Sequence, residues 1–545
     1  MYSHTKALCE NIIYSKILNP HGLEPIGIIL ERPKQKELGH FATPVGFVLA
    51  KSLHKSPNIL AQEIAQHLCQ QQEFSKVMAV SGYVNLTLSP SFLNKLCESA
   101  LEGNYFSAQR KAQHSVLLEF VSANPTGPLH IGHARGAIYG DSLRRIGEFL
   151  GFKIVSEYYI NDAGAQIETL GLSVFLAGSE ILGKSVSYPE QYYKGLYIVD
   201  IAKAAMEKFG QKIFDDKKNI ALLSEFAKDL MLLEIKNNLR EINIEFESFV
   251  SERALFSQWS KTLETLKIHQ GIQEKEGKTW LLSSLKGDEK DRVIVRENGE
   301  PTYLAGDIIY HNNKFLRDFE SYINIWGADH HGYITRLKAA IDFLGFDSSR
   351  LEILLSQMVA LRKGGENYKM SKRAGNFILL KDVIADIGAD ALRFVFLTKS
   401  IDTHLEFDVE DLRSQDSNNP IFYINYANAR IHTLLEKSAF DKTKLLQADL
   451  EKFLQKDSEV SYNLANLIFH ALSLKQVLQV SFTTREIQKL CEYLKALAGD
   501  LHSFYNTYKI LDTPNAAEIL KALFVVSQSL TLGLHLIGIT AKTKM

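Results

Sequence analysis

Two histidines three residues apart, His130 and His133, are the strongest candidates in the sequence for chemistry on a phosphate group. They stand at the start of a helical pattern, so their imidazoles share one face of the helix. A helix N-terminus favours anions, and both rings can donate to the same phosphoryl group. Gly132 between them has no Cβ, so a flat base can approach the backbone closely. The alternative is a glycine-containing turn with two solvated histidines, because so short a motif has a real false-positive rate.

The segments on either side of the histidines predict how they are positioned. An apolar run at 116–121 is typical of a buried strand. Residues 122–128 are rich in turn and loop formers, and a helix is predicted from about 135 to 149. Strand, Gly/Pro loop and helix in this order indicate the start of a nucleotide-binding crossover.

Several short stretches together resemble a known family. His130-Ile-Gly-His133 resembles the HIGH signature of class I aminoacyl-tRNA synthetases. Lys369-Met-Ser-Lys372-Arg373 resembles their KMSKS signature, with Arg in the last place. The flanking sequences are similar, more narrowly, to arginyl-tRNA synthetases: Glu119-Phe-Val-Ser-Ala-Asn-Pro-Thr-Gly127, Tyr303-Leu-Ala-Gly-Asp307 and Asp390-Ala-Leu-Arg393. The resemblance covers essentially the whole chain.

The resemblance implies a two-step ligation that consumes ATP. The arginine carboxylate attacks the α-phosphate to give arginyl-adenylate and pyrophosphate, and the terminal ribose hydroxyl of tRNA(Arg) then takes the aminoacyl group. His130, Gly132 and His133 would bind ATP, with both histidines holding the phosphoryl group. Lys369 and Lys372, in a loop preceded by two glycines, would bind ATP and stabilise the departing pyrophosphate. Mg²⁺ is expected to accompany the ATP.

Candidate residues for binding arginine come from two stretches. Tyr303 and Asp307 are four residues apart in a predicted helix, so they share a face. A carboxylate accepts two parallel N–H bonds from a guanidinium, which an ammonium cannot reproduce. The alternative is an ordinary exposed aspartate on a helix. The resemblance implies further that Ser122 and Asn124 hold the α-amino and carboxylate end of the amino acid, with Glu119 at the edge of the pocket.

A third polar stretch follows the strand predicted at 322–326. It contains Asp329, His330 and His331. Polar residues at the C-terminal end of such a strand lie where α/β sheets bind ligands. The resemblance implies contacts with substrate or ATP, and which of the three makes them stays open, because histidines in loops are often only solvated.

The predicted fold has a Rossmann-type α/β catalytic domain with a parallel sheet and a helical insertion. An α+β domain precedes it, and an all-α helix bundle follows it. The boundaries we expect are 1–108 for the N-terminal domain, 109–345 for the split catalytic domain with its insertion at about 166–285, 346–412 for the region with the second signature, and 413–545 for the bundle.

The two outer domains are expected to contact the tRNA. By resemblance, residues 1–108 contact its elbow and the bundle binds its anticodon. Tyr423, Tyr426 and Arg430 suit this, because aromatic faces beside arginines stack on unpaired bases. The alternative is an aromatic stripe in a helical core. Asn428 stands where the family leads us to expect a histidine.

Composition narrows the class of protein. The chain has 545 residues, enough for three or four domains, and is 46% hydrophobic and 23% charged. Its net charge of −1 means that RNA contacts must come from local basic patches. Four scattered cysteines without a Cys-x-x-Cys pair argue against a zinc site, and we predict no metal site. Lacking a signal peptide pattern and an uninterrupted run of 18 apolar residues, the chain is expected to be a cytoplasmic monomer without membrane contact.

Three alternatives remain for the function. A class I synthetase for another amino acid is the nearest, although glutamate would prefer cations where Tyr303 and Asp307 stand. A non-catalytic tRNA-binding paralogue should show a broken HIGH signature or missing lysines. A small nucleotidyltransferase could share the His-x-Gly-His turn, but the chain length and helical C-terminal part argue against it.

Overall fold

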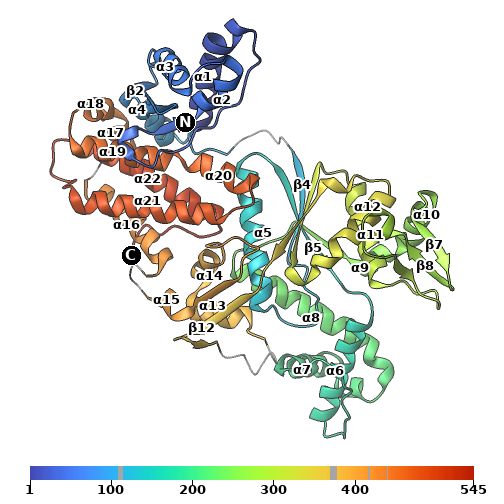
Figure 1. The fold of residues 1–545 in the computed structure, drawn as a ribbon. Helices are drawn as coiled ribbons and strands as arrows, with labels where there is room; N and C mark the ends of the chain where they lie inside the picture. The colour runs from blue at the N-terminus through green and yellow to red at the C-terminus, as the bar shows by residue number, and fades with distance from the viewer. Residues whose placement is uncertain (109–113, 369–376, 415, 417, 439) are drawn as a thin grey trace.

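A five-stranded parallel sheet lies at the centre of the molecule (Figure 1). The computed structural model describes residues 1–108, 114–368, 377–414, 416, 418–438 and 440–545. The strand order is β11-β10-β4-β5-β6, and every neighbouring pair is parallel. The strands are β4 (Ser115–Glu119), β5 (Lys153–Ile160), β6 (Ser248–Ser251), β10 (Ser321–Gly327) and β11 (Leu351–Ser356). The chain moves outward from β4 on one side and returns to β10 on the other, so the topological switch point lies between β4 and β10.

Helix α5 (Ile131–Phe149) carries the two histidines at its start and packs closely on the sheet. Two glycines allow this approach. A Cβ at Gly140 would collide with the ring of Phe120, and one at Gly147 would collide with Ile154 of β5. The predicted strand, loop and helix around His130 and His133 are therefore present, with the helix beginning at Ile131, directly after His130.

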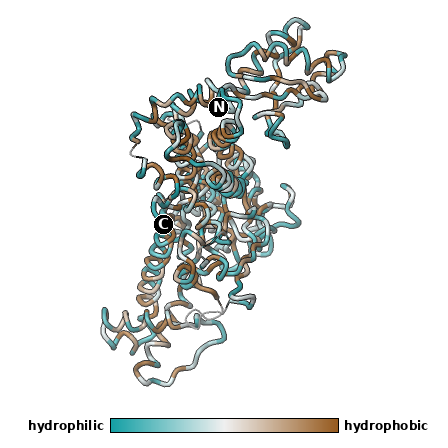
Figure 2. Tube along the Cα trace, turned by 90° about the vertical axis from the view of Figure 1, so that its left-hand side faces the viewer, coloured by the Kyte–Doolittle hydropathy of each residue, from teal (hydrophilic) through white to brown (hydrophobic). Residues whose placement is uncertain are grey.

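The helical insertion projects from the catalytic domain, at the opposite end of the molecule from the N-terminal domain (Figures 1 and 2). Its helices are α6 (Ala165–Ile181), α7 (Leu196–Phe209) and α8 (Ile220–Glu241), which share a hydrophobic core of their own. The structure differs from expectation in the rest of the range 166–285. This range also contains β6 of the central sheet and the strands β7 (Ile272–Lys275) and β8 (Lys278–Leu281). Strands of four residues carry too few alternations to be recognised by periodicity.

Helices α11 (Tyr303–Leu316) and α12 (Ile334–Phe343) flank β10 in the second half of the catalytic domain. A 3₁₀ helix, Ala328–Tyr333, joins β10 to α12. The helix predicted to begin near Thr302 is present, with Thr302 at the N-cap of α11. Ahead of it, β7, β8 and β9 (Arg292–Val295) form a small antiparallel sheet, preceded by α9 (Glu252–Leu255) and α10 (Trp259–Ile268).

Apart from β11, which belongs to the central sheet, the described residues between 346 and 413 form a small layer beside α5. It contains a three-stranded sheet of β12 (Val359–Lys363), β13 (Glu366–Asn367) and β14 (Leu405–Asp408). The helices are α13 (Leu380–Ile387), α14 (Ala389–Phe396) and α15 (Val409–Arg413). Arg135 of α5 fastens the layer, because its guanidinium donates to the carbonyls of Gln357, Ser400 and Thr403.

The two outer parts of the chain have the predicted α+β and all-α architectures. The N-terminal domain consists of α1 (Tyr2–Ile13), β1 (Phe41–Thr43), α2 (Val45–Leu53), α3 (Pro57–Leu68), β2 (Phe74–Val80), β3 (Tyr83–Leu88) and α4 (Pro90–Leu101). The C-terminal bundle consists of α16 (Pro420–Ser438), α17 (Lys442–Gln447), α18 (Leu450–Leu454), α19 (Glu459–Leu472), α20 (Leu474–Thr483), α21 (Gln488–Thr507) and α22 (Ala516–Leu536).

Helix α22 is long and apolar enough to cross a membrane by length and composition alone. In this fold it is a core helix of the bundle, and 72% of its most apolar window is buried. Hydrophobic and hydrophilic residues are interspersed along the trace of the whole chain (Figure 2). The N-terminal domain docks on the same bundle, because Lys521 of α22 donates to Glu98 of α4 over 3.1 Å.

One buried arginine joins the catalytic helix to two other parts of the chain. Arg393 of α14 is fully buried and donates to Asp141 of α5 over 2.5 Å. It also donates to the carbonyl of Ile242, just after α8, and to that of Ile537, just after α22. Gly538 has φ +75, and a Cβ there would collide with the guanidinium. The position of α5 therefore depends on groups from both the insertion and the bundle.

Candidate active site

The two histidines form a stacked pair at the N-terminus of α5. Their ring centroids lie 3.6 Å apart. Nδ1 of His130 accepts from the backbone N–H of Gly132 over 3.1 Å, and Nδ1 of His133 accepts from the N–H of His130 over 3.4 Å. Because both Nδ1 atoms are acceptors, the neutral rings carry their protons on Nε2. The pair thus offers two Nε2–H donors at a helix N-terminus.

Burial keeps these imidazoles neutral. Burial and, to a lesser degree, the neighbouring His130 together lower the pKa of His133 to about 3. Burial also lowers the pKa of His130. Near pH 7 the histidines therefore act as neutral hydrogen-bond donors, and charge neutralisation of an anion must come from other groups.

The segment that follows the second signature lies directly against the histidine pair. The N–H of Ile131 donates to the carbonyl of Ile378, and the N–H of Leu380 donates to that of Leu129, each over 3.0 Å. The ring of Phe377 stacks on His130 with 5.1 Å between the centroids. Lys369 and Lys372 lie outside the described residues.

The turn that leaves β4 adopts an uncommon backbone conformation. Val121 has φ +69 and Ser122 has φ +41, in the left-handed region that a β-branched residue rarely enters. Such strain costs on the order of 1–3 kcal/mol per residue and persists where the surroundings enforce it. Here the Ser122 hydroxyl donates to Glu119 over 2.9 Å and accepts from the N–H of Tyr159 over 3.1 Å.

The residues predicted to hold the α-amino end of a substrate lie in or beside this turn. The Ser122 hydroxyl is already engaged with Glu119 and Tyr159, so its visible role is to shape the turn. Asn124 donates its side-chain N–H to Gln166 of α6 over 2.7 Å. The turn lies at the C-terminal end of β4, on the side of the switch point where parallel sheets bind ligands.

Two carboxyl groups meet on the face of α11. The Tyr333 hydroxyl donates to Asp307 over 2.6 Å. Glu252 of α9 is 6% exposed, and its Oε2 has no hydrogen-bond partner among the described residues. Gly306 makes this approach feasible, because a Cβ there would collide with the Glu252 carboxylate. An unpartnered buried carboxylate oxygen costs free energy unless a ligand satisfies it.

The two carboxyls raise the cost of ionising each other. Burial and, to a lesser degree, the nearby Glu119 charge together raise the pKa of Asp307 to about 6. Burial, with the Asp307 and Asp162 charges, raises the pKa of Glu252 to about 7. Such perturbed carboxyls in a crevice are typical of a functional site.

Neighbouring buried carboxylates do have cations. Arg317 donates two parallel bonds to Glu157, over 2.6 and 2.8 Å. Lys314 lies 2.5 Å from Glu119. Within the described part of the chain, no lysine or arginine forms an ion pair with Asp307 or Glu252. The absence of a partner cation at Asp307 and Glu252, among the described residues, is the strongest indication that this site binds a cationic ligand.

Sequence reasoning missed two of these residues and placed a third differently. Tyr303 shares a helix face with Asp307 as predicted, but its side chain is 61% exposed, and the phenol that contacts Asp307 is Tyr333. Glu252 was not a candidate. Tyr333 and Glu252 lie in segments that are distant from Asp307 in the sequence. Tyr333 directly follows Gly327-Ala-Asp-His-His-Gly332, which the sequence analysis did single out.

Asp329, His330 and His331 lie in the 3₁₀ helix that follows β10, and all three side chains are exposed. This is the other side of the β4/β10 switch point from the histidine pair. Nε2 of His330 lies 3.9 Å from the Asp329 carboxylate. Their individual roles stay predictions.

The bundle brings the predicted aromatic residues together around an arginine. The guanidinium of Arg430 lies 4.8 Å from the ring centroid of Tyr426 and 4.1 Å from that of Tyr505. It also donates to Nδ1 of His502, whose Nε2 donates to the carbonyl of Tyr423. Tyr426 is 40% exposed, so part of this cluster is open to a ligand rather than buried in a core.

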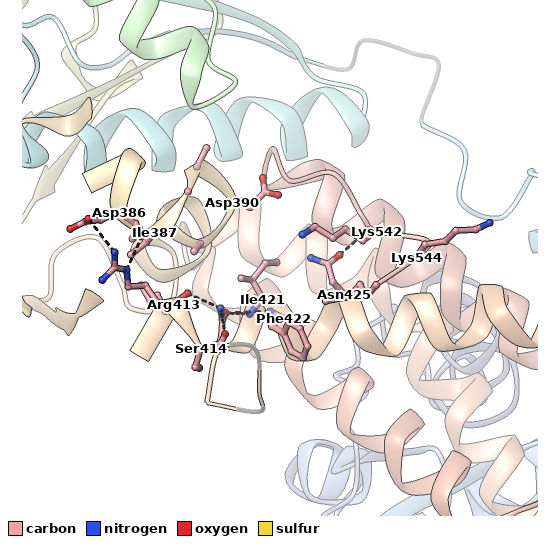
Figure 3. A pocket seen from close by; sticks show the side chains of 16 residues that line it. Asp386, Ile387, Asp390, Arg413, Ser414, Ile421, Phe422, Asn425, Lys542 and Lys544 are labelled. Carbon is pink, nitrogen blue, oxygen red and sulfur yellow. Dashed lines mark hydrogen bonds and ion pairs between the residues drawn. The ribbon is translucent and has the colours of Figure 1, made fainter. Parts of the chain in front are cut away.

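A separate cleft of about 830 Å³ lies between α13–α15 and the bundle (Figure 3). Arg413 points across it toward Asp386, and Asn425 accepts from the N–H of Lys542. Phe422, Lys542 and Lys544 also line it. Its walls do not include the histidine pair or the carboxyl pair, so it is a different site from the catalytic crevice.

Profiles of three protein domains match this chain in succession. Residues 6–88 match the N-terminal domain of arginyl-tRNA synthetases. Residues 96–403 match the catalytic domain of class I (R) tRNA synthetases, and residues 424–545 match the DALR anticodon-binding domain.

Curated relatives are similar over nearly their full length. The arginine--tRNA ligase of Wolinella succinogenes is 58% identical over 520 residues, which is 95% of this chain and 97% of the relative. That of Helicobacter acinonychis is 53% identical, covering 100% of this chain and 99% of the relative.

Solved structures share the fold. A Campylobacter jejuni crystal structure assigned as an arginyl-tRNA synthetase is 54% identical, with a TM-score of 0.80, and covers 84% of this chain and all of its own. The Thermus thermophilus arginyl-tRNA synthetase is 19% identical with a TM-score of 0.76, over 99% of this chain and all of its own, and shows the same fold.

Proposed function

The chain belongs to the arginyl-tRNA synthetase family of class I, and we propose on this premise that the crevice between β4 and β10 activates L-arginine with ATP and charges tRNA(Arg). The observation that carries the proposal is the carboxyl pair of Asp307 and Glu252. Glu252 directly follows β6 and the histidine pair follows the turn after β4, so both pairs belong to the C-terminal edge of the parallel sheet. The carboxyl pair lacks a cation among the described residues. A guanidinium supplies both the charge and the paired N–H donors that two carboxylates accept.

Arginine would be held at both ends. Its guanidinium would meet Asp307 and Glu252, with Tyr333 orienting the Asp307 carboxylate through the 2.6 Å hydrogen bond. Tyr303 would cover the guanidinium from the exposed side of α11. Its α-amino and carboxylate groups would meet the turn after β4, where Asn124 is the most available side chain. Ser122 and Glu119 shape that turn from below.

The chemical step needs orientation and charge stabilisation rather than covalent help from the protein. The arginine carboxylate oxygen bonds to the α-phosphorus of ATP, and the bond to pyrophosphate breaks. His130 and His133 would donate through Nε2–H to the phosphoryl oxygens as charge grows on them. Because these rings are neutral, the positive charge for the leaving pyrophosphate would come from Lys369 and Lys372. The stacking of Phe377 on His130 supports the closeness of that loop.

Mg²⁺ would enter with the nucleotide. Among the described residues no group of three or more His, Cys, Asp or Glu side chains is arranged to hold a metal. The donor set that remains is phosphate oxygen and water, which suits Mg²⁺. The ion would neutralise charge on the triphosphate. The other contacts proposed above with arginine and ATP would be made by protein side chains.

The tRNA would span the outer domains. The cluster of Tyr423, Tyr426 and Arg430 suits stacking on unpaired bases, since one partly exposed ring is backed by a guanidinium. The domain division we propose is 1–108 for the elbow, 109–345 and 346–412 for catalysis, and 413–545 for the anticodon.

We also propose a cytoplasmic monomer, which sedimentation of the purified protein alone and with tRNA would test.

The proposal is tested by pyrophosphate exchange over a panel of amino acids, with and without tRNA. We expect exchange with arginine and background signal with lysine, glutamate and cysteine, because only arginine carries a guanidinium. Exchange with a different amino acid would move the chain to another specificity. Absence of exchange under every condition, together with intact tRNA binding, would favour a non-catalytic paralogue.

Arginine binding should weaken as the pH falls below 7. The guanidinium stays charged, whereas Asp307 and Glu252 have pKa values raised to about 6 and about 7 in the free protein. Binding a cation requires the ionised carboxylates, so protonation competes with arginine. We expect the KM for arginine to rise between pH 7.5 and 5.5, by up to about tenfold per pH unit for each titrating group. Protonation of His133 should not contribute to this change, because its pKa is lowered to about 3. A flat arginine profile would contradict the assignment.

A further inference from the structure

Lys314 is a buried lysine two turns beyond Asp307 on α11. Its side chain is 1% exposed. Nζ lies 2.5 Å from Glu119 Oε2 and 2.8 Å from Asn324 Oδ1, and 4.3 Å from the ring centroid of Tyr310. Burying an ammonium is costly unless its donors are all met. The carboxylate, the amide oxygen and the aromatic ring together satisfy the Lys314 ammonium. Its position behind the arginine site therefore suggests that it acts on that site.

On one side, Lys314 reaches the turn that follows β4. Glu119 uses one oxygen for Lys314 and accepts from the Ser122 hydroxyl with the other. Ser122 is one of the two left-handed residues of that turn. The strained turn is therefore fastened to Lys314 through a single carboxylate.

On the other side, Lys314 reaches the backbone of Asp307. Asn324 accepts from Lys314 and donates to Nε2 of His311 over 3.0 Å. Nδ1 of His311 then donates to the carbonyl of Asp307 over 2.8 Å. Asn324 and His311 are both buried, so this path is shielded from water.

The two paths begin from neighbouring strands. Glu119 of β4 and Asn324 of β10 face each other in register, at the topological switch point. Lys314 of α11 hydrogen-bonds to both of these side chains and so connects the two strands. The bridge lies behind the two places where the ends of an arginine would bind, the turn after β4 and the carboxyl pair on α11. Fully satisfied buried networks of this kind rigidify what they connect.

We propose that Lys314 is a positioning residue for arginine. It holds the turn after β4 and Asp307 at a fixed separation and balances the negative charge of Glu119 behind Asp307. This inference rests on the arginine site proposed above, and it adds a residue that touches no substrate.

The charge balance can be tested because several groups act on Asp307 with different signs. The groups that face it are Tyr333 and His330 from the 3₁₀ helix, Glu119 from β4, Lys314 from its own helix, Glu252 from α9 and Tyr159 from β5. Among them, the Lys314 charge lowers the pKa of Asp307 and the Glu119 charge raises it. Removing one or the other should therefore move arginine binding along the pH axis in opposite directions.

The experiment measures the KM for arginine in aminoacylation from pH 5.5 to 8.5. In Lys314→Met we expect at least a tenfold rise in KM for arginine at pH 7, with the KM for ATP within twofold of wild type. The pH profile should shift upward by about one unit, since an opposing charge is lost. In Glu119→Gln the profile should shift downward. Lys314→Arg keeps the charge but not the fit, so it should raise the KM without an upward shift.

Lys521→Met is the matched control. Lys521 is also fully buried and also bound to a single carboxylate, Glu98, but it joins the N-terminal domain to the bundle. It should lose stability to a similar degree while keeping the wild-type arginine profile. Unshifted profiles in Lys314→Met and Glu119→Gln, or a shift of the same kind in Lys521→Met, would overturn the inference.

The outcomes also separate this inference from the proposed function. A wild-type protein without arginine-dependent activity refutes the proposed function. An active wild type with unshifted variants refutes only the role of Lys314. If Lys314→Met does not yield folded protein, Glu119→Gln and Lys314→Arg still test the inference, because the first should shift the pH profile downward and the second should raise the KM for arginine without shifting the profile.

Discussion

Replacing Asp307 by Asn is expected to lower kcat/KM for arginine by about 100- to 1000-fold or more. The substitution keeps the shape and removes one of the two charges that the guanidinium meets. Losing one partner of a buried charged hydrogen-bond pair costs roughly 3–5 kcal/mol, and each 1.4 kcal/mol is about tenfold. The measurement is arginine-dependent pyrophosphate exchange with bound tRNA, alongside ATP binding by calorimetry, which should be unchanged.

Citrulline gives this prediction a sharper test, because it replaces the guanidinium by a neutral group of the same shape. Wild type should bind citrulline far more weakly than arginine. Asp307→Asn should lower arginine affinity and leave citrulline affinity almost unaltered, so that discrimination collapses. Tyr333→Phe retains both carboxylates and should cost only a few-fold. Full arginine activity in Asp307→Asn would remove the guanidinium assignment.

His133→Asn should lower kcat for adenylate formation by about 100- to 1000-fold, with little change in the KM for arginine. A donor directed at developing charge on an oxyanion is worth this much when it is removed. Nε2–H of His133 is such a donor, since Nδ1 is occupied by the N–H of His130. Single-turnover formation of arginyl-adenylate is the direct measurement.

His40→Asn is the matched control for this variant. His40 is also a buried histidine whose Nδ1 accepts from a backbone N–H, but it lies in the N-terminal domain. Its loss should lower stability without altering adenylate formation. Equal effects of the two substitutions on kcat would mean that His133 acts only through folding. As far as His133 is concerned, the rate should also be insensitive to pH between 6 and 8, because burial lowers the pKa of this residue to about 3.

The features that could be predicted from the sequence are those with local signals. The strand, loop and helix around His130 rest on an apolar run, a Gly/Pro cluster and a helical period in one continuous stretch. Asp307 was proposed for the guanidinium because Tyr303-Leu-Ala-Gly-Asp307 resembles the motif of the family, and the four-residue spacing places the two residues on one face of a helix. The domain architecture followed from long segments with strong periodicity and from the resemblance of their motifs to a family.

The features that escaped prediction depend on contacts between distant segments. Strand β6 is only four residues long, and it is extended because it pairs in parallel with β5. Glu252 follows it directly, so missing the strand also hid the carboxylate. In the sequence, nothing distinguishes Lys314 from an exposed lysine on a helix. It is buried because β4, β10 and α11 pack together around it.

The junction at Arg393 has a consequence for how the protein is made. Its guanidinium bonds to a carbonyl that is synthesised 144 residues later. At ribosomal speeds of about 5–20 residues per second, that acceptor follows after roughly 7–30 s. During this interval the nascent catalytic helix has an incomplete anchorage, although its histidines have long been translated. Competence for aminoacylation should therefore arise late in biogenesis, when the segment after α22 closes over the arginine.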